Sequence, residues 1–542
     1  MPDAGANSTP GVYVGEISAF PPSIVGVQTA VPVFVGYTGK AEIGGKPIVC
    51  RPISISSLAA FEEVFGGAHK PLYALAEVGD AETDVYDVRV IEPATGTARF
   101  YRLDAEGPSF NLYNAMRLFY ANGGGSCYVV SAGLYGDVTA TVDKTALLAG
   151  LAAAAEQVGP TMLVVPDAVL LPPDSPAKPW VSTEYGEVAS AMLRQGETLR
   201  DRVAVLDVYG TQHLSQPAAA GAAPTLDDVI GAFRVNVGDA GLSYGMAYFP
   251  FVNTSIVSPA EVAYTSIDDA PSGTGSVGAL RQILTWENAN LYGKPADPAV
   301  PTPRQVQVQA DIDRIGTVTD PADVKALDAV LTAALPLLAE MERVVATKEG
   351  VLPAAPALAG VMTYVDGTRG VWNAPANVSL TAVASPTVVL DNNQQEGLNV
   401  PLDGKAVDVL RAFPGRGTVV WGARTLDGNS ADYRYIQVRR TLIYIEQSIK
   451  NALEPFTFAP NTGQTWATVV SMVSSFLQSL WSQGGLMGAT PADAFSVACG
   501  VGSTMTGTDV LNGWMIVQVT LSLIRPAEFI ELTFKQKMED VD

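Results

Sequence analysis

Short apolar runs alternate with helix-like segments through the middle of this chain. The apolar runs, which predict buried strands, lie at residues 127–130, 162–167, 203–208 and 245–251. Between them, apolar side chains at helical spacing predict helices at residues 144–158, 185–201 and 229–237. Strands that are apolar throughout and alternate with helices are typical of a parallel sheet covered on both faces. The pattern therefore predicts a central α/β domain.

The segments before this region favour strands. Residues 31–37 form a short apolar strand, and residues 84–92 and 97–103 flank a Pro-Ala-Thr-Gly turn in the pattern of a β-hairpin. Another strand is predicted at residues 12–17, ahead of any segment that would form a core with it. A strand isolated at a chain end either joins the sheet of its own domain or pairs with the edge of another chain.

The last third of the chain mixes strands with amphipathic helices. We expect strands or short mixed segments at residues 406–413, 417–423, 434–451, 494–497 and 514–525, with a long helix inside 434–451 and another at 466–481. Clean alternation at residues 529–534 predicts a second isolated strand at this end. Earlier, residues 255–310 are rich in Pro, Gly, Asp and Ser and predict inserted loops, whereas residues 360–365 predict a further strand.

These changes of pattern divide the chain of 542 residues into four parts, because one hydrophobic core rarely serves so long a chain. The expected fold class is α/β plus α+β, in several domains. The parts are an arm at residues 1–20, a β-rich region at 21–124, the α/β domain at 125–368 and an α+β domain at 369–542.

Composition narrows the classes of partner. Apolar residues make up 48% of the chain and charged residues 16%, which favours a large folded core. The net charge of -22 repels phosphate backbones, so no nucleic acid partner is expected. Cys50, Cys127 and Cys499 lack metal-ligand spacing and are expected to be buried thiols. Neither a secretory signal nor an apolar run long enough for a membrane span is present, so we expect cytoplasmic assembly without membrane insertion.

Candidate catalytic and metal-binding patterns are weak. A Ser-His-Asp enzyme needs a histidine beside an activated serine, yet His69 precedes the α/β region and His213 follows a strand without supporting residues. Both histidines are expected to be solvated loop residues. The Gly run at residues 123–125 ends a helix and is followed by no lysine, so it is not a phosphate loop.

Four aspartates are the candidate ligands for a metal site. They lack ligand spacing, and aspartates at strand ends commonly cap helices; they are Asp167, Asp174, Asp207 and Asp391. We therefore predict no metal, no cofactor and no catalytic residue, and hence no enzyme.

Several sequence strings resemble those of phage tail sheath proteins. They are TPGVYVGEI at 9–17, GVQTAVPVFVG at 26–36, RGVWNAPAN at 369–377, LRAFPGRG at 410–417, VWGARTL at 420–426, YRYIQVRR at 433–440 and RPAEFI at 525–530. They cover the chain ends and much of the last third, whereas the middle matches only in its α/β pattern.

The resemblance implies a subtilisin-like central α/β domain without catalysis and a C-terminal domain facing an inner tube. Strands exchanged between subunits would join the subunits into a helical cylinder that is assembled in an extended, metastable state. Contraction would drive the tube through a target membrane. The implied partners are other copies of the chain, the inner tube protein, and baseplate and terminal cap proteins. A single chain that carries both end motifs favours a phage tail, a tailocin or an extracellular contractile injection system.

The resemblance also assigns roles to residues. The expected subunit-linking strands contain Val12, Tyr13, Val14, Ile17, Phe529, Ile530, Leu532 and Phe534. The candidate tube- or neighbour-facing charges are Arg411, Arg416, Arg434, Arg439, Arg440, Lys535 and Lys537. Structural ion pairs within the domain are the alternative role for the arginines.

Two other functions stay open at this point. One is an inactive or cryptic subtilisin-like hydrolase, against which the small number of histidines argues. The other is a non-contractile lattice protein of a cell surface, against which the missing secretion signal argues.

Overall fold

The computed structural model describes residues 23–79, 85–138, 141–214, 223–269, 278–293, 300–529 and 531. They fall into two compact units. Among the described residues, the smaller unit comprises those up to Val27 together with Tyr444–Ile524, and the larger comprises those of Gln28–Ile443 together with those from Arg525 onward. The boundary between them falls inside helix α12 (Ile436–Leu453), so one helix contributes to both units.

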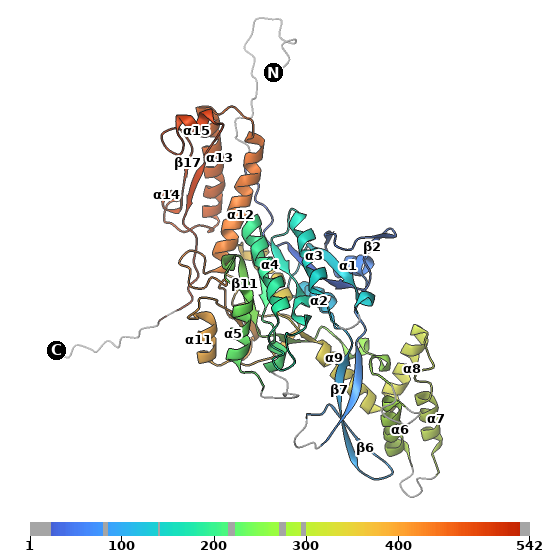
Figure 1. Cartoon of the computed structure of the whole chain (residues 1–542). Helices are drawn as coiled ribbons and strands as arrows, with labels where there is room; N and C mark the ends of the chain where they lie inside the picture. The colour runs from blue at the N-terminus through green and yellow to red at the C-terminus, as the bar shows by residue number, and fades with distance from the viewer. Residues whose placement is uncertain are drawn as a thin grey trace, which may run out of the picture. The chain divides into compact units, whose positions relative to one another are not determined.

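An eight-stranded sheet forms the centre of the larger unit (Figure 1). Its order is β16-β15-β11-β10-β9-β1-β8-β4. The strands are β1 (Pro32–Thr38), β4 (Ile53–Ile55), β8 (Cys127–Leu134), β9 (Met162–Val164), β10 (Val203–Asp207), β11 (Gly245–Phe249), β15 (Asp408–Phe413) and β16 (Gly417–Val420). Pairing is parallel from β8 to β15, and the edge strands β4 and β16 pair antiparallel. The predicted α/β pattern is confirmed.

Both faces of this sheet are buried, which explains why its strands are apolar throughout. In β1, Val33 and Val35 belong to the core on one face and Phe34 to the core on the other. Helices α3 (Lys144–Glu156), α4 (Thr183–Leu199) and α5 (Leu226–Val237) contribute to the first core. Helices α1 (Leu58–Phe65), α2 (Leu112–Ala121) and α10 (Ala355–Arg369) contribute to the second.

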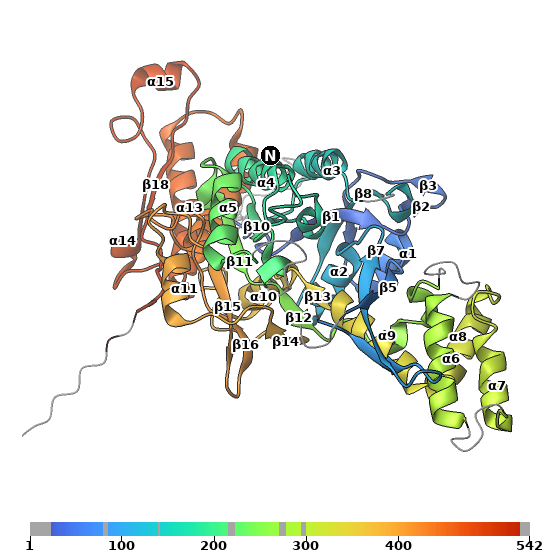
Figure 2. The ribbon, with the colours of Figure 1, turned by 60° about the horizontal axis from the view of Figure 1, so that its bottom comes forward.

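A third hydrophobic core lies in a lobe of the larger unit made from two distant segments (Figure 2). Its sheet has the order β5-β7-β6. The elements are β5 (Leu72–Val78), β6 (Val88–Ile91), β7 (Ala98–Glu106), α6 (Ala279–Tyr292), α7 (Pro303–Ile312), α8 (Pro321–Ala334) and α9 (Pro336–Glu349). The hairpin of β6 and β7 was predicted and is confirmed.

Two predicted segments are wrong. Residues 255–310 contain α6 and most of α7 and are not only loops, since Ile283, Leu284 and Val308 enter the third core at helical spacing. Flanking Pro and Gly residues obscured that spacing. Residues 360–365 lie inside α10 and form no strand. Because α10 is buried on most sides, its apolar run lacks the alternation that separates a helix from a buried strand.

The smaller unit combines the end of α12 with α13 (Gly463–Ser482), α14 (Pro491–Ala494), α15 (Gly507–Leu511) and a two-stranded sheet. Strands β17 (Phe495–Ala498) and β18 (Gln518–Leu521) pair antiparallel. Buried Val469, Val473, Leu477 and Leu480 lie on one side of α13, which confirms the predicted amphipathic helix.

Shorter elements complete the larger unit. They are β2 (Glu42–Ile43), β3 (Lys46–Pro47), β12 (Val252–Thr254), β13 (Val351–Leu352), β14 (Val383–Pro386) and α11 (Asn392–Asn399). The division into four sequence segments remains a prediction; the eight-stranded sheet crosses two of its boundaries, because β1 and β4 precede residue 125 and β15 and β16 follow residue 368.

Aspartates at the ends of strands cap neighbouring backbone, as predicted. Asp167 accepts hydrogen bonds from the backbone N–H groups of Tyr37 at 2.7 Å, Asn111 at 2.6 Å and Leu112 at 3.2 Å. The Asp207 carboxylate accepts one from the Ala355 N–H at 2.8 Å, at the start of α10. Burial raises the pKa of Asp167 to about 6 although these bonds oppose the shift. Both residues therefore fix helices to the sheet.

In the lobe, Glu287 of α6 has a buried carboxyl group, and only one of its two oxygens has a hydrogen-bond partner among the residues described. Its Oε1 accepts a hydrogen bond from the Leu337 N–H at 2.8 Å, whereas Oε2 is buried without a hydrogen-bond partner among the residues described. Burial raises the pKa of this group to about 7, although the Leu337 bond lowers it.

We predict that Glu287→Gln stabilises the lobe at pH 8 and leaves it unchanged below about pH 4.5. Because the pKa is raised in the folded state, the free energy of unfolding falls as pH rises from about 4.5 to 7. Glutamine cannot ionise, so it removes the cost of a buried carboxylate, about 1–2 kcal/mol. Hydrogen exchange of α6 and α9 peptides measures it as slower exchange at pH 8. Glu340→Gln is the control, because Glu340 pairs with Arg343 and its pKa is lowered. Faster exchange in Glu287→Gln at pH 8 would contradict the prediction.

Candidate functional site

Most of the residues predicted to link subunits lie outside the described residues. These are Val12, Tyr13, Val14, Ile17, Ile530, Leu532 and Phe534, together with the candidate charges Lys535 and Lys537. Phe529 is described, and 76% of its surface is exposed. The structure does describe the two places where the chain leads toward these ends, and we call them the N-terminal root (Thr29–Val31) and the C-terminal root (Arg525–Phe529).

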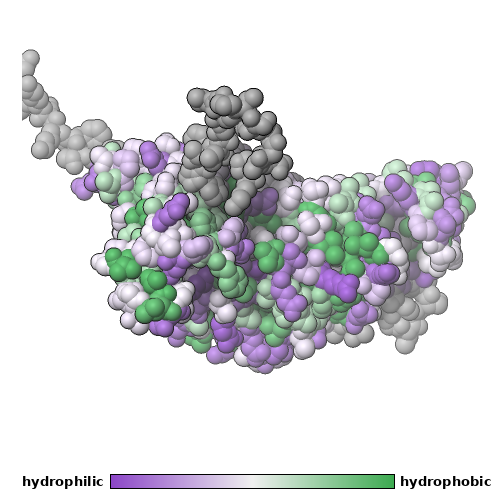
Figure 3. Space-filling model, turned by 90° about the horizontal axis from the view of Figure 1, so that it is seen from above, coloured by the Kyte–Doolittle hydropathy of each residue, from purple (hydrophilic) through white to green (hydrophobic). Residues whose placement is uncertain are grey.

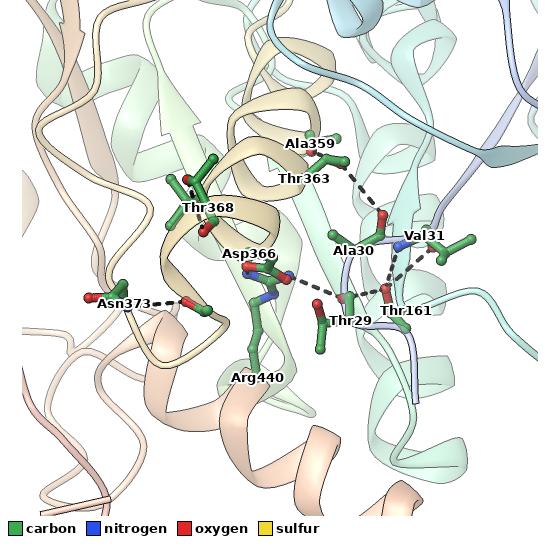
Figure 4. Close-up of polar contacts among 12 residues, drawn as sticks. Thr29, Ala30, Val31, Thr161, Ala359, Thr363, Asp366, Thr368, Asn373 and Arg440 are labelled. Atoms are coloured by element: carbon green, nitrogen blue, oxygen red, sulfur yellow. Dashed lines mark hydrogen bonds and ion pairs between the residues drawn. The ribbon is translucent and has the colours of Figure 1, made fainter. Parts of the chain in front are cut away.

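An arginine of α12 holds the N-terminal root. Arg440 donates two hydrogen bonds to the carboxylate of Asp366 in α10, at 3.0 and 2.6 Å, and one to the carbonyl of Thr29 at 3.1 Å (Figure 4). Only 3% of the Arg440 side chain and 4% of the Asp366 side chain are exposed. The Thr161 hydroxyl also donates to the Thr29 carbonyl, at 2.7 Å, and accepts from the Val31 N–H at 2.9 Å.

This buried pair ties three segments together. The planar guanidinium matches the carboxylate with two parallel hydrogen bonds, which is the geometry that offsets desolvation best. Removing one partner of such a pair leaves a buried charge uncompensated, at a cost of about 3–5 kcal/mol. The pair therefore fixes α10, α12 and the backbone that leads into β1 at one point.

Within the smaller unit, the residues that precede this root contact the later part of α12. The Val27 N–H donates to the Ser448 hydroxyl at 3.1 Å, and Ser448 is fully buried. Gly26 lies directly against the Tyr444 side chain, so a Cβ atom at this position would meet the Tyr444 hydroxyl oxygen. A larger residue at position 26 would therefore displace the Tyr444 side chain.

A second arginine holds the C-terminal root. Arg424 donates to the Glu528 carboxylate from Nε at 3.0 Å and from Nη2 at 2.6 Å. The Asn399 amide and the Tyr435 hydroxyl donate to the same carboxylate at 2.7 and 3.2 Å. Only 4% of the Arg424 side chain is exposed, against 20% for Glu528. All four residues belong to the larger unit.

These contacts shift the pKa values of the pair in opposite directions. Burial acts to raise the pKa of Glu528, but hydrogen bonds from Arg424 and Asn399 outweigh it and leave the pKa below its usual range. Burial acts to lower the pKa of Arg424, and the bonds to Glu528 raise it above its usual range. Asp408 lies behind the pair and accepts from the Arg424 N–H at 2.8 Å; burial raises its pKa well above the ordinary value.

The structure separates the arginines that were grouped from the sequence. Arg439 is buried between the rings of Tyr244 and Tyr433, with its guanidinium carbon 4.3 and 3.8 Å from the ring centres. Arg440 forms the buried pair with Asp366 described above. The remaining three are partly or fully exposed: Arg434 donates to the carbonyl of Ser430, and Arg411 and Arg416 lie on the β15–β16 hairpin.

Sequence reasoning did not find the partners of these arginines. They include Thr29, Thr161, Asp366, Asn399 and Glu528. Glu528 stands in the RPAEFI string, which marked its neighbourhood but not its role. Asp366 follows a segment assigned as a strand, so its position opposite Arg440 on a helix could not be anticipated.

No metal centre is found in the described part of the chain. No group of three or more His, Cys, Asp or Glu side chains there is placed to hold a metal ion. His69 packs edge-on against Phe110 and Tyr135, at 4.8 and 5.3 Å between ring centres, and burial lowers its pKa. Burial also lowers the pKa of His213; both histidines are half-buried, so they are less solvated than predicted. Among the helices that are described, none is long and apolar enough to cross a membrane.

Comparisons with known proteins agree with one another. The family model described as "Phage tail sheath C-terminal domain" matches residues 429–537. A chain in the cryo-EM structure of the anti-feeding prophage (AFP) helical sheath in the contracted state is 25% identical, with a TM-score of 0.55; the alignment covers 98% of this chain and 100% of that one.

Two further cryo-EM structures share the fold. A chain of the PVC sheath complex of an extracellular contractile injection system, in the contracted state, is 23% identical with a TM-score of 0.53, over 98% of this chain and 99% of that one. A chain of the AFP baseplate in the contracted state is 20% identical with a TM-score of 0.59, over 99% and 100%. A search of curated protein sequences finds no match.

We predict that Arg440→Met and Asp366→Asn are each strongly destabilising and that their effects are not additive. Each single change leaves one buried polar partner uncompensated, by about 3–5 kcal/mol, whereas the double variant leaves no isolated charge. Hydrogen exchange of peptides from β1 and α10 measures the local effect. Lys144→Met at the exposed pair with Glu187 is the control and is expected to change little. Strict additivity of the two buried changes would contradict the prediction.

Proposed function

We propose that this chain belongs to the phage tail sheath protein family and that its two ends join neighbouring subunits by adding strands to their sheets. The chain is a contractile sheath subunit, as its C-terminal family match and its likeness to the AFP sheath support. The observation that carries the strand exchange is the two-stranded sheet of the smaller unit, which lies within the matched residues.

A sheet of two strands is marginally stable alone and presents open edges. Strands β17 and β18 pair with each other and with no third strand in the described part of the chain. Added strands would complete this sheet through backbone hydrogen bonds, with alternate side chains giving specificity. We propose that residues 12–17 and 529–534 supply these strands to neighbouring copies.

The two roots are suited to chain ends that transmit force between subunits. A strand that pairs with a neighbour transmits force to the point where its own chain enters the folded unit. Arg440 holds one of these points through charge-assisted bonds to Asp366 of α10 and to the Thr29 carbonyl, and Arg424 holds the other through charge-assisted bonds to Glu528. We propose that the links persist during contraction, while differences in interface burial between two lattice states supply the energy.

Apolar side chains at the surface support a subunit that other chains cover. Figure 3 shows hydrophobic residues in several groups among hydrophilic ones on one face of the molecule. In the smaller unit the most exposed large apolar side chains include Phe458, which is fully exposed, and Leu511 and Trp514, which are 87% and 64% exposed. Such exposure is expected at contacts with other chains. We propose the inner tube, baseplate and cap proteins of a phage-tail-like particle as the further partners.

The central α/β domain is proposed to be subtilisin-like and structural, without catalysis. The alternative of a cryptic hydrolase is supported by no described arrangement of serine, histidine and aspartate. Labelling of the purified chain by a serine-directed probe would favour that alternative. We propose assembly in the cytoplasm, in a particle that drives its tube through a target membrane.

Electron microscopy of particles that contain this chain tests the function directly. We expect cylinders around a narrower tube, which become shorter and wider after mild acid or urea treatment and expose the tube. Discrete globular particles under all conditions would overturn the proposal.

We predict that deleting residues 1–17 leaves a folded subunit that forms no stable cylinder, because the linking strand is lost. Tyr13→Pro is a milder version, since proline cannot donate to a β-ladder, and Ala4→Pro outside the strand is its matched control. Sedimentation and negative-stain images measure assembly, and thermal unfolding checks the subunit. Normal contractile cylinders from the deletion would refute the strand exchange.

A further inference from the structure

The β15–β16 hairpin carries two arginines whose charge is not neutralised in the described part of the chain. Arg411 donates to the side-chain oxygens of Asn392 and Gln395, at 2.9 and 2.8 Å. Arg416 donates to the side-chain oxygen of Asn377 at 2.8 Å. These partners are neutral amides, so they position the guanidinium groups without cancelling their charge.

Aromatic rings order the same surface. The ring of Phe413 lies between the two arginines, with its centre 5.8 Å from the guanidinium carbon of Arg411 and 6.0 Å from that of Arg416. Phe413 also packs against Trp421 at 4.7 Å, and 38% of Trp421 is exposed. We call these four residues the basic hairpin; Figure 2 shows the strands that carry them.

The basic hairpin is held ready for a partner. Gly415 and Gly417 adopt positive φ values of 73° and 69°, which fixes a tight turn at its tip. Each guanidinium already has amide and ring contacts, so binding a carboxylate would cost little further side-chain entropy. Arginine forks are also well matched to carboxylates.

Among the other arginines of this part of the chain, two are neutralised by carboxylates, one is enclosed by rings, and Arg434 donates to the carbonyl of Ser430. Arg424 and Arg440 are paired with Glu528 and Asp366, and Arg439 is enclosed by two tyrosines. The chain as a whole has 55 acidic and 33 basic residues and a net charge of -22. Copies of such a chain repel one another unless basic sites meet acidic surfaces.

We infer that the basic hairpin docks on an acidic surface of a neighbouring copy of this chain. The inference rests on the proposed function, because it presupposes a homopolymer. A second copy is complementary in charge, because the acidic excess of the chain supplies the carboxylates that the hairpin lacks.

The test reverses the charge of the hairpin. Arg411→Glu/Arg416→Glu is compared with Arg194→Glu/Arg304→Glu, which changes the net charge equally. Arg304 is a close match, since it is exposed and lies 5.5 Å from the ring of Tyr292. Thermal unfolding shows whether the charge-reversal variant folds. If it does not fold, the milder variant Arg411→Gln/Arg416→Gln takes its place.

We expect the hairpin variants to lower the yield of sedimentable sheath by about ten-fold or more at low salt, equivalent to about 1.4 kcal/mol. The wild-type yield should fall as salt is raised, and that dependence should weaken in the hairpin variants. Arg411→Lys/Arg416→Lys should retain the salt dependence.

Wild-type yield from the hairpin variants would overturn the inference. So would a variant that polymerises without the tube but fails to assemble on it, since the hairpin would then face the tube. If the wild-type chain itself formed no sheath, the proposed function would be refuted instead, which keeps the two failures distinct.

Discussion

The ion pair between Arg440 and Asp366 fixes the point at which the chain enters its central sheet. Thr29, whose carbonyl Arg440 binds, lies three residues before β1. Strand β1 is flanked by β8 and β9 and has a core on each face, so a slip at its start would move side chains on both faces. Desolvation makes such a buried ion pair costly to form. Removing only one of its two partners costs more, because the other charge stays buried without compensation. The register of the sheet and the direction of the leading segment are thus set together.

The C-terminal root is also fixed by an ion pair, Arg424 with Glu528, which is more exposed than the pair of Arg440 with Asp366. Glu528 is partly exposed, and bonds from Arg424 and Asn399 lower its pKa although burial opposes them. A lowered pKa in the folded state means that this stabilisation is present above the ordinary glutamate value and is lost only as pH falls below it. The root is therefore intact at neutral pH. Both roots belong to the larger unit.

The sequence predicted the α/β pattern because strands with two buried faces are apolar without interruption. It failed where that signal has two meanings: the apolar run at residues 360–365 belongs to a buried helix, α10. It failed again at α6 and α7, where Pro- and Gly-rich flanks outweighed the helical spacing. For the roots, the sequence marked Arg440 and the string around Glu528. Their partners come from segments tens to hundreds of residues away, and no local pattern encodes such pairs.

The arginines of the last third illustrate why a charge cluster in a sequence is ambiguous. The same residue type is a buried partner of a carboxylate at Arg440, a filling between two tyrosines at Arg439, and a surface charge held by amides at Arg411. Burial alone does not distinguish an arginine that holds a root from an arginine that binds a neighbouring chain, because both roles need an ordered side chain. What separates them is the charge of the partner. A carboxylate cancels the field of the guanidinium, whereas an amide oxygen orders it and leaves the field intact, so only the latter can attract an acidic neighbour.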